Sequence, residues 1–160
     1  HIQAKSVVRF QPYREGIADA LVFELGDEHC YSYLGRIGGL QPIYISSECS
    51  WQNIVHEVLH ALGFVHEHSR SSRDAYINIL WDNIEEDFKP QFDLAPEQWL
   101  KRWSEFPYDI HSIMHYPSVA FSRNQSDPTI LQKNGETIPF REGLSPGDVE
   151  KLNALFNAPK

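Results

Sequence analysis

The chain has 160 residues, 41% hydrophobic and 12% aromatic, which is enough apolar material for one compact core over 1–160. Its net charge of −8 argues against a nucleic-acid-binding surface, which needs clustered lysine and arginine. No basic amphipathic stretch suggests a membrane surface, and no apolar run approaches the roughly 18 residues of a membrane-spanning helix. We therefore expect a monomeric globular domain without a nucleic-acid or membrane partner.

The first third of the chain predicts a small sheet. Short segments rich in Val, Ile, Phe and Tyr, separated by Gly, Pro and Asp, indicate strands at 6–10, 20–25 and 42–46. The two cysteines, Cys30 and Cys49, form either a disulfide or a pair of buried thiols, and their spacing leaves both open. A bridge would close a loop of about 20 residues and stabilise the fold by on the order of 3 kcal/mol.

Helices are predicted at three places. Ser50 can cap a helix from Trp51 to about Leu62, with apolar residues at 54, 55, 58, 59 and 62 available for burial. The segment 95–103 has a helical pattern, and Ser145 begins a helix that runs to about Phe156. The residues between these last two helices predict mostly loop.

The stretch HEVLHALGFVHEH, residues 56–68, predicts a metal site. His56 and His60 are four residues apart, so both project from one face of the first helix. Gly63 can take the left-handed conformation that ends a helix, which brings His66 back as a third ligand. The other five histidines lack such spacing, and we expect them to be solvated or hydrogen-bonded: His1, His29, His68, His111 and His115.

This ligand set favours a catalytic zinc site. Three neutral imidazoles leave the fourth zinc position for water, whereas structural zinc is closed by four protein ligands. Glu57 follows the first ligand and can take a proton from that water and pass it to a leaving amine. The predicted reaction is hydrolysis of a peptide bond.

The pattern H-E-x-x-H-x-x-G-x-x-H, followed by SIMHY at 112–116, resembles the metzincin metallopeptidases. Glu67 directly after the third histidine, and Tyr116 two residues after Met114, resemble the astacin branch. Other branches differ at these flanking residues and are weaker alternatives. The resemblance covers nearly the whole chain, with further matches in KSVVRF, CYSYLGRIGG, HEHSRSSRDAY, SIMHYPSVAFS and LSPGDVEKLNALF.

The resemblance implies roles for single residues. His56, His60 and His66 would bind zinc, and Glu57 would be the general base and acid. Tyr116 would ligate zinc in the resting enzyme and then stabilise the oxyanion; the weaker alternative is a core aromatic residue beside the methionine turn. Met114 would form a hydrophobic floor beneath the metal, although by itself it would be taken for a core methionine.

The resemblance also implies an α+β, metzincin-like fold. This fold has a small, twisted, mostly parallel sheet and the zinc helix above a cleft, with a largely irregular lower half and a C-terminal helix. Protein or peptide substrates would lie along an edge strand, for which 39–46 is the matching segment. Lys133 matches a loop position where some relatives place a basic residue in the pocket after the scissile bond; otherwise it is a solvated surface lysine.

Two departures from the family pattern bear on these expectations. Family members usually carry four cysteines, but Val7 stands where the first falls; Cys30 and Cys49 match the other pair, which implies a disulfide and a secreted or otherwise exported protein. The resemblance also implies that 1–160 is a single family domain without its N-terminal part. The amino terminus of an activated member packs near the glutamate matching Glu67, and on this expectation His1 would not be that terminus.

Two function classes follow. The first is a secreted zinc endopeptidase, and the second is a catalytically silent zinc-binding module that recognises proteins through the same cleft. Glu57 favours the enzyme, because a module that only binds has no need of a base.

Overall fold

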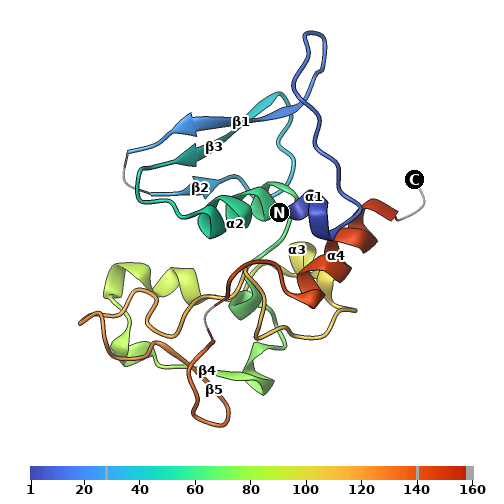
Figure 1. Ribbon diagram of the computed structural model, residues 1–160. Helices are drawn as coiled ribbons and strands as arrows, with labels where there is room; N and C mark the ends of the chain where they lie inside the picture. The colour runs from blue at the N-terminus through green and yellow to red at the C-terminus, as the bar shows by residue number, and fades with distance from the viewer. Residues whose placement is uncertain (28, 140, 158–160) are drawn as a thin grey trace. The chain divides into compact units, whose positions relative to one another are not determined.

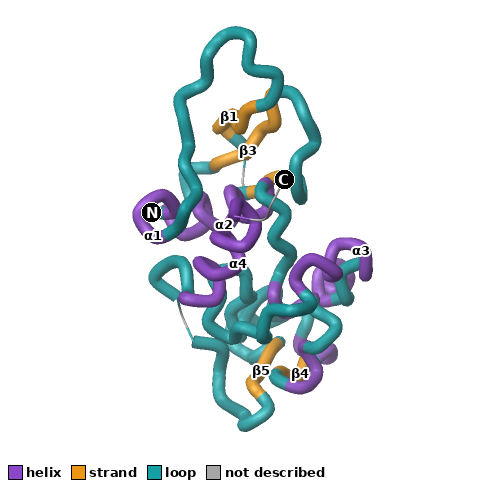
Figure 2. The backbone as a smooth tube through the Cα atoms, turned by 90° about the vertical axis from the view of Figure 1, so that its right-hand side faces the viewer, coloured by secondary structure: helices purple, strands orange, loops and turns teal. Residues whose placement is uncertain are grey.

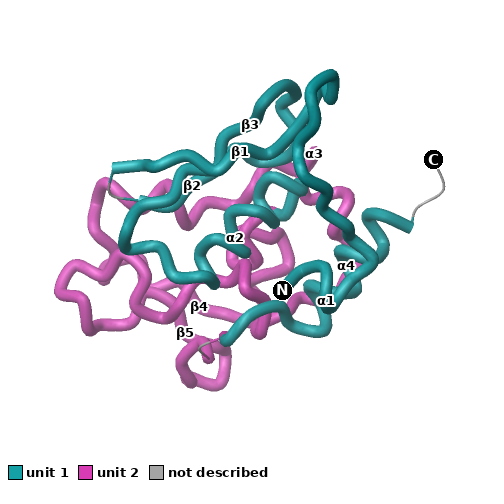
Figure 3. The backbone as a smooth tube through the Cα atoms, turned by 45° about the horizontal axis from the view of Figure 1, so that its top comes forward, with its two compact units in different colours: residues 1–64, 142–160 teal, residues 65–141 magenta. Residues whose placement is uncertain are grey.

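The computed structural model describes residues 1–27, 29–139 and 141–157. The chain divides into two compact units, which Figure 3 colours separately. Unit 1 holds residues 1–64 and 142–160, and unit 2 holds residues 65–141. Within the described ranges, no helix is both long enough and apolar enough to cross a membrane. The expectations of one domain over 1–160 and of a monomer stay predictions.

Unit 1 contains a three-stranded sheet in the order β1-β3-β2. Strand β1 (Ala20–Leu25) matches its prediction and pairs in parallel with β3 (Leu40–Ile45), which starts two residues before its predicted range. Strand β2 (Tyr31–Ser32) was not predicted and pairs with β3 in the antiparallel sense.

Strand β3 lies in the middle of this sheet, so the expectation that 39–46 is the edge strand is wrong. Ile43 in β3 is paired on both sides, with Phe23 and with Ser32, and its side chain is fully buried. Strand β3 is thus paired along one side by β1 and at Ile43 and Tyr44 by β2, and the edges of this sheet are β1 and β2.

The predicted strand at 6–10 is also wrong. Helix α1 (Ile2–Lys5) ends at Ser6, and the chain to residue 19 forms no strand. Its backbone groups find side chains as partners instead: the Val7 N–H donates to Asn153 Oδ1, and the Arg9 guanidinium donates to the Ser6 carbonyl. The β-branched residues indicated extended backbone correctly, but there is no neighbouring strand to pair with.

Helix α2 (Trp51–Ala61) packs against β2 and β3, beside the sheet of unit 1 (Figure 1). Its start is the predicted one, because the Ser50 hydroxyl accepts the Asn53 N–H while the Asn53 side chain accepts the Ser50 N–H. Val58 and Leu59 are buried. The apolar face therefore holds this helix in a fixed position against the strands.

The two cysteines form a disulfide between Cys30 and Cys49, with their Cα atoms 6.0 Å apart. Cys30 directly precedes β2, and Cys49 directly precedes the cap residue Ser50. The bridge therefore joins the start of an edge strand to the start of α2, and the implied pairing is confirmed.

The C-terminal helix, α4 (Pro146–Asn157), is confirmed and belongs to unit 1. Ser145 caps it, since the Ser145 hydroxyl accepts the Asp148 N–H and the Asp148 carboxylate accepts the Ser145 N–H. Its residue Asn153 is the partner of Val7, so α4 lies beside the N-terminal segment of the same unit (Figure 1).

Unit 2 is largely irregular, as the family resemblance implied. It has one small antiparallel sheet, formed by β4 (Ile77–Ile79) and β5 (Ile130–Gln132), which lie side by side in Figure 2. Its other described elements are short helices: η1 (Glu67–Ser69), η2 (Arg73–Ala75), η3 (Trp81–Asn83), η4 (Glu86–Phe92), α3 (Glu97–Leu100) and η5 (Lys101–Trp103). Its core consists of Ile77, Ile84, Phe92, Tyr108, Ile130 and Ile138.

The helix predicted at 95–103 is shorter and is divided into α3 and η5. Proline disfavours helical backbone in the residue before it, and Ala95 precedes Pro96. The helix begins at Glu97, and the Ala95 N–H before it donates to the Ser69 carbonyl.

Candidate metal centre

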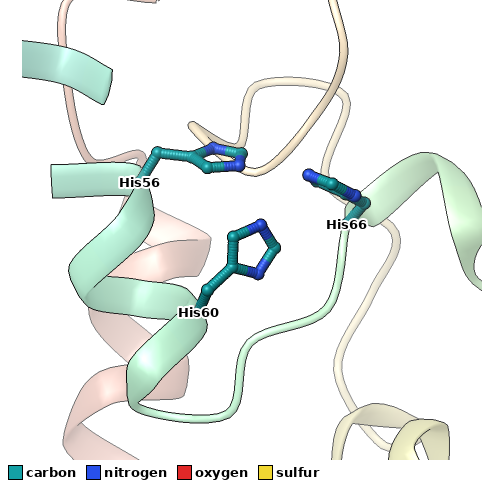
Figure 4. A group of neighbouring side chains, drawn as sticks. All are labelled: His56, His60 and His66. Atoms are coloured by element: carbon teal, nitrogen blue, oxygen red, sulfur yellow. The ribbon is translucent and has the colours of Figure 1, made fainter. Parts of the chain in front are cut away.

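Three histidine side chains meet at the C-terminal end of α2. One ring nitrogen from each of His56, His60 and His66 lies within 4.8 Å of the others, and all three residues are partly buried. Figure 4 shows the three rings pointing toward one another, two from α2 and one from the segment that follows it. This is the group that the sequence spacing predicted.

The end of α2 determines how the chain returns to His66. Gly63 has φ +94°, the left-handed conformation that was predicted for it. The Phe64 N–H donates to the Leu59 carbonyl and the Gly63 N–H to the His60 carbonyl, which together form a Schellman motif. Phe64 and Leu59 are both buried, as that motif favours.

The same turn orients His60. Its Nδ1 lies 2.8 Å from the Phe64 carbonyl oxygen. A carbonyl can only accept, so Nδ1 carries the hydrogen and Nε2 keeps its lone pair for a metal. The pKa of His60 is lowered to about 3, mainly by burial and to a smaller extent by the neighbouring His56. The hydrogen bond with the Phe64 carbonyl acts in the opposite direction and raises the pKa. The neutral imidazole is the form that binds zinc.

Glu57 follows His56 on α2 and is only 7% exposed. Burial raises the pKa of its carboxyl to about 7, while hydrogen bonding from Ser32 acts in the opposite direction. The Ser32 hydroxyl also donates to the Glu57 backbone carbonyl at 2.8 Å, which fixes β2 beside this turn of α2. Glu57 is thus a buried carboxyl that can hold or release a proton near neutral pH.

The segment SIMHY packs against the residue that follows His66. The Glu67 N–H donates to the Met114 carbonyl at 3.0 Å, and the Met114 side chain is 1% exposed. The Tyr116 ring lies beside His66, with centroids 4.5 Å apart. The floor role of Met114 and the ligand role of Tyr116 stay predictions.

Glu67 is bonded within unit 2. Its carboxylate accepts Arg70 Nη1 at 2.6 Å and the Asp109 N–H at 2.8 Å, and both ion-pair side chains are almost fully buried. Arg70 also donates to the carbonyls of Pro107, Trp103 and Phe106. These hydrogen bonds connect the segment 67–70, which follows His66, to the segment 103–109, which precedes SIMHY.

Lys133 is exposed at the end of β5, where its Nζ donates to Asn78 Oδ1 at 2.6 Å. Its pocket role stays a prediction.

Several residues that support the centre were not predicted from the sequence: Ser32, Phe64, Arg70, His68 and His115. Ser32, Arg70 and the two histidines carried a sequence signal, since they lie within stretches that match the family, whereas Phe64 occupies an unspecified position of the histidine pattern.

Comparisons with known proteins agree with this centre. A family model described as Astacin, a peptidase family, matches residues 1–157. The zinc metalloproteinase nas-13 of Caenorhabditis elegans is 40% identical over 158 residues, covering 97% of this chain and 34% of that protein. Meprin A subunit alpha of Rattus norvegicus is 38% identical, covering 96% of this chain and 21% of that protein. The chain thus spans less than half the length of these relatives.

A solved structure also matches. High choriolytic enzyme 1, a hatching enzyme zinc-protease from Oryzias latipes, superposes with a TM-score of 0.84 and 33% identity. The match covers 99% of this chain and 78% of that one. The α+β fold predicted from the motifs is therefore confirmed, and zinc is the metal that the three histidines fit.

Proposed function

We propose that this chain, which belongs to the astacin family of peptidases, is a zinc-dependent endopeptidase that hydrolyses peptide bonds in proteins or peptides. The main support is the convergence of His56, His60 and His66, because three imidazoles bind zinc and leave a position open. Zinc, when bound, supplies a Lewis acid that polarises a carbonyl and acidifies water.

The protein's own residues would do the rest. Glu57 is buried next to the first ligand and would accept a proton from the attacking water, then deliver it to the leaving amine. The phenol of Tyr116, beside His66, would donate a hydrogen bond to the oxygen that becomes negatively charged.

An extended substrate would pair with an edge of the sheet in unit 1. Of the two edges, β2 is the one bonded to α2, through Ser32 and the Glu57 carbonyl, so we assign the substrate to β2 rather than to 39–46. We also propose that the protein is exported, because its disulfide suits an oxidising compartment.

The test is hydrolysis of a denatured protein substrate by the zinc-loaded chain, with and without a chelator. Chelation should abolish cleavage, and added zinc should restore it. Glu57→Ala removes no ligand, so it should keep zinc and the fold while losing at least about 100-fold in rate. Near-normal hydrolysis by a zinc-loaded Glu57→Ala variant would contradict the mechanism.

A further inference from the structure

Two histidines outside the ligand group are buried in unit 2. His68 is fully buried and His115 is 8% exposed. The proposed mechanism uses neither of them. Both, however, contact Tyr116, the first through its ring and the second through its backbone.

His68 faces the ring of Tyr116. The two rings are stacked, with centroids 4.0 Å apart and planes at 28°. His68 Nε2 lies 3.0 Å from the Gln91 carbonyl oxygen, so that nitrogen carries a hydrogen and donates it. The imidazole is therefore held by η4 at one side and presents a fixed flat face to Tyr116.

Phe92 and Phe121 contact the Tyr116 ring at steeper angles. Phe92 meets it at 76° with centroids 5.8 Å apart, and Phe121 is tilted at 5.5 Å. Phe121 has φ +52°, which is rare for a residue with a bulky side chain. Such a conformation persists only where the surroundings impose it, here in contact with Tyr116 and stacked on Phe88.

The backbone of Tyr116 is held separately. His115 Nδ1 lies 2.8 Å from the Tyr116 carbonyl oxygen, and His115 Nε2 lies 2.7 Å from the Tyr108 hydroxyl. The carbonyl can only accept, so Nδ1 donates and Nε2 accepts from the phenol. With the backbone fixed in this way, the position of the Tyr116 hydroxyl depends on how its ring is packed.

We propose that His68 is a positioning residue for Tyr116. Its imidazole stacks on the phenol ring of Tyr116 and keeps that ring beside His66. In this orientation the Tyr116 hydroxyl would be directed to the metal centre. This inference rests on the role given to Tyr116 in the proposed function. Without a flat ring at position 68, the phenol loses its stacked contact and samples more orientations.

Kinetics provide the first test. In His68→Leu we expect kcat to fall about tenfold with KM nearly unchanged, a loss no larger than the roughly 10- to 1,000-fold expected for removing the Tyr116 hydroxyl itself. His68→Phe keeps a ring and should recover most of that loss. In the Tyr116→Phe background, His68→Leu should have little further effect on kcat, because the hydroxyl it positions is absent.

The control is His111→Leu, which changes an exposed histidine of the same unit and should leave kcat unchanged. An equal loss from His68→Leu in the wild-type and Tyr116→Phe backgrounds would mean that His68 acts through the fold or through His66, whose ring it also contacts at 5.2 Å, and not through Tyr116; that result would overturn the proposal.

The second test does not depend on activity. The apo chain is loaded with Cu²⁺, and phenolate-to-copper charge-transfer absorption is measured. We expect the band in the wild type and in His68→Phe, a weakened or shifted band in His68→Leu, and no band in Tyr116→Phe. Any one of three results would overturn the proposal. These are an absent band in the wild type, an unaltered band in His68→Leu, and a missing band in folded, copper-loaded His68→Phe. An inactive wild type with the expected spectra would reject the peptidase function alone.

Discussion

At Tyr116 the hydroxyl should matter more to the transition state than to metal binding. Three histidines suffice to hold zinc, whereas a phenol can donate a hydrogen bond to a developing oxyanion. Tyr116→Phe should therefore keep the ion and lower kcat by roughly 10- to 1,000-fold, with little change in KM. Metal analysis and steady-state kinetics check this. Unchanged kcat would leave Tyr116 as a core aromatic residue.

Lys133 is the residue that we expect to influence cleavage preference. A cation in the pocket after the scissile bond should favour Asp or Glu at that substrate position. Profiling a peptide library should show this preference, and Lys133→Ala should remove it. Asn78→Ala is the matched control, because it removes the hydrogen-bond partner of Lys133 and keeps the charge. If the preference is missing, or survives in Lys133→Ala, Lys133 is an ordinary surface lysine.

Among the elements, α2 and its C-terminal turn were predicted closely because their determinants are local. A cap at Ser50, an apolar face and a glycine at 63 lie within fourteen consecutive residues, 50–63, and each acts on its neighbours. Strands β2, β4 and β5 were missed, since each has two or three residues and depends on partners far along the chain. Segment 6–10 failed for the same reason: its residues suited a strand, and only the fold decides whether a partner exists.

The turn that ends α2 provides a prediction at this scale. Gly63→Ala should lower the free energy of unfolding of the apo chain by about 1 kcal/mol, because a Cβ is unfavourable in the left-handed region. The cost is conformational, since an added Cβ would approach only Gly35 Cα, at 4.0 Å. The turn also brings back His66, so we expect zinc affinity to fall roughly tenfold.

Gly16→Ala is the control for that experiment. Gly16 has φ +91°, against +94° for Gly63, and has no atoms within 4 Å of an added Cβ. It should show a similar stability loss in denaturant titrations with zinc affinity unchanged. Equal zinc affinity in both variants would show that the turn does not control the third ligand.

For the molecule as a whole, the metal ligands could be predicted from sequence and much of their support could not. The spacing of His56, His60 and His66 reflects the geometry of one helix and one turn. The Phe64 carbonyl that orients His60 belongs to the backbone, which every residue has, so no sequence signal distinguishes it. His68 and Tyr116 lie about fifty residues apart in the sequence, so only the folded chain shows that their rings stack. The hydrogen bond from His115 to the Tyr116 carbonyl depends on which ring nitrogen carries the hydrogen, and the sequence does not specify this.

Whether the chain unfolds as one domain can be tested because its spectroscopic probes are distributed unevenly between the two units. Three of the four tryptophans, Trp81, Trp99 and Trp103, lie in unit 2, whereas the two long helices, α2 and α4, lie in unit 1. Urea unfolding followed by tryptophan fluorescence therefore reports mainly on unit 2, and far-ultraviolet circular dichroism mainly on unit 1. With zinc bound, we expect the two curves to coincide, as for a single cooperative domain over 1–160. Separate midpoints would mean that the units are independent domains, and the single-domain prediction would be wrong.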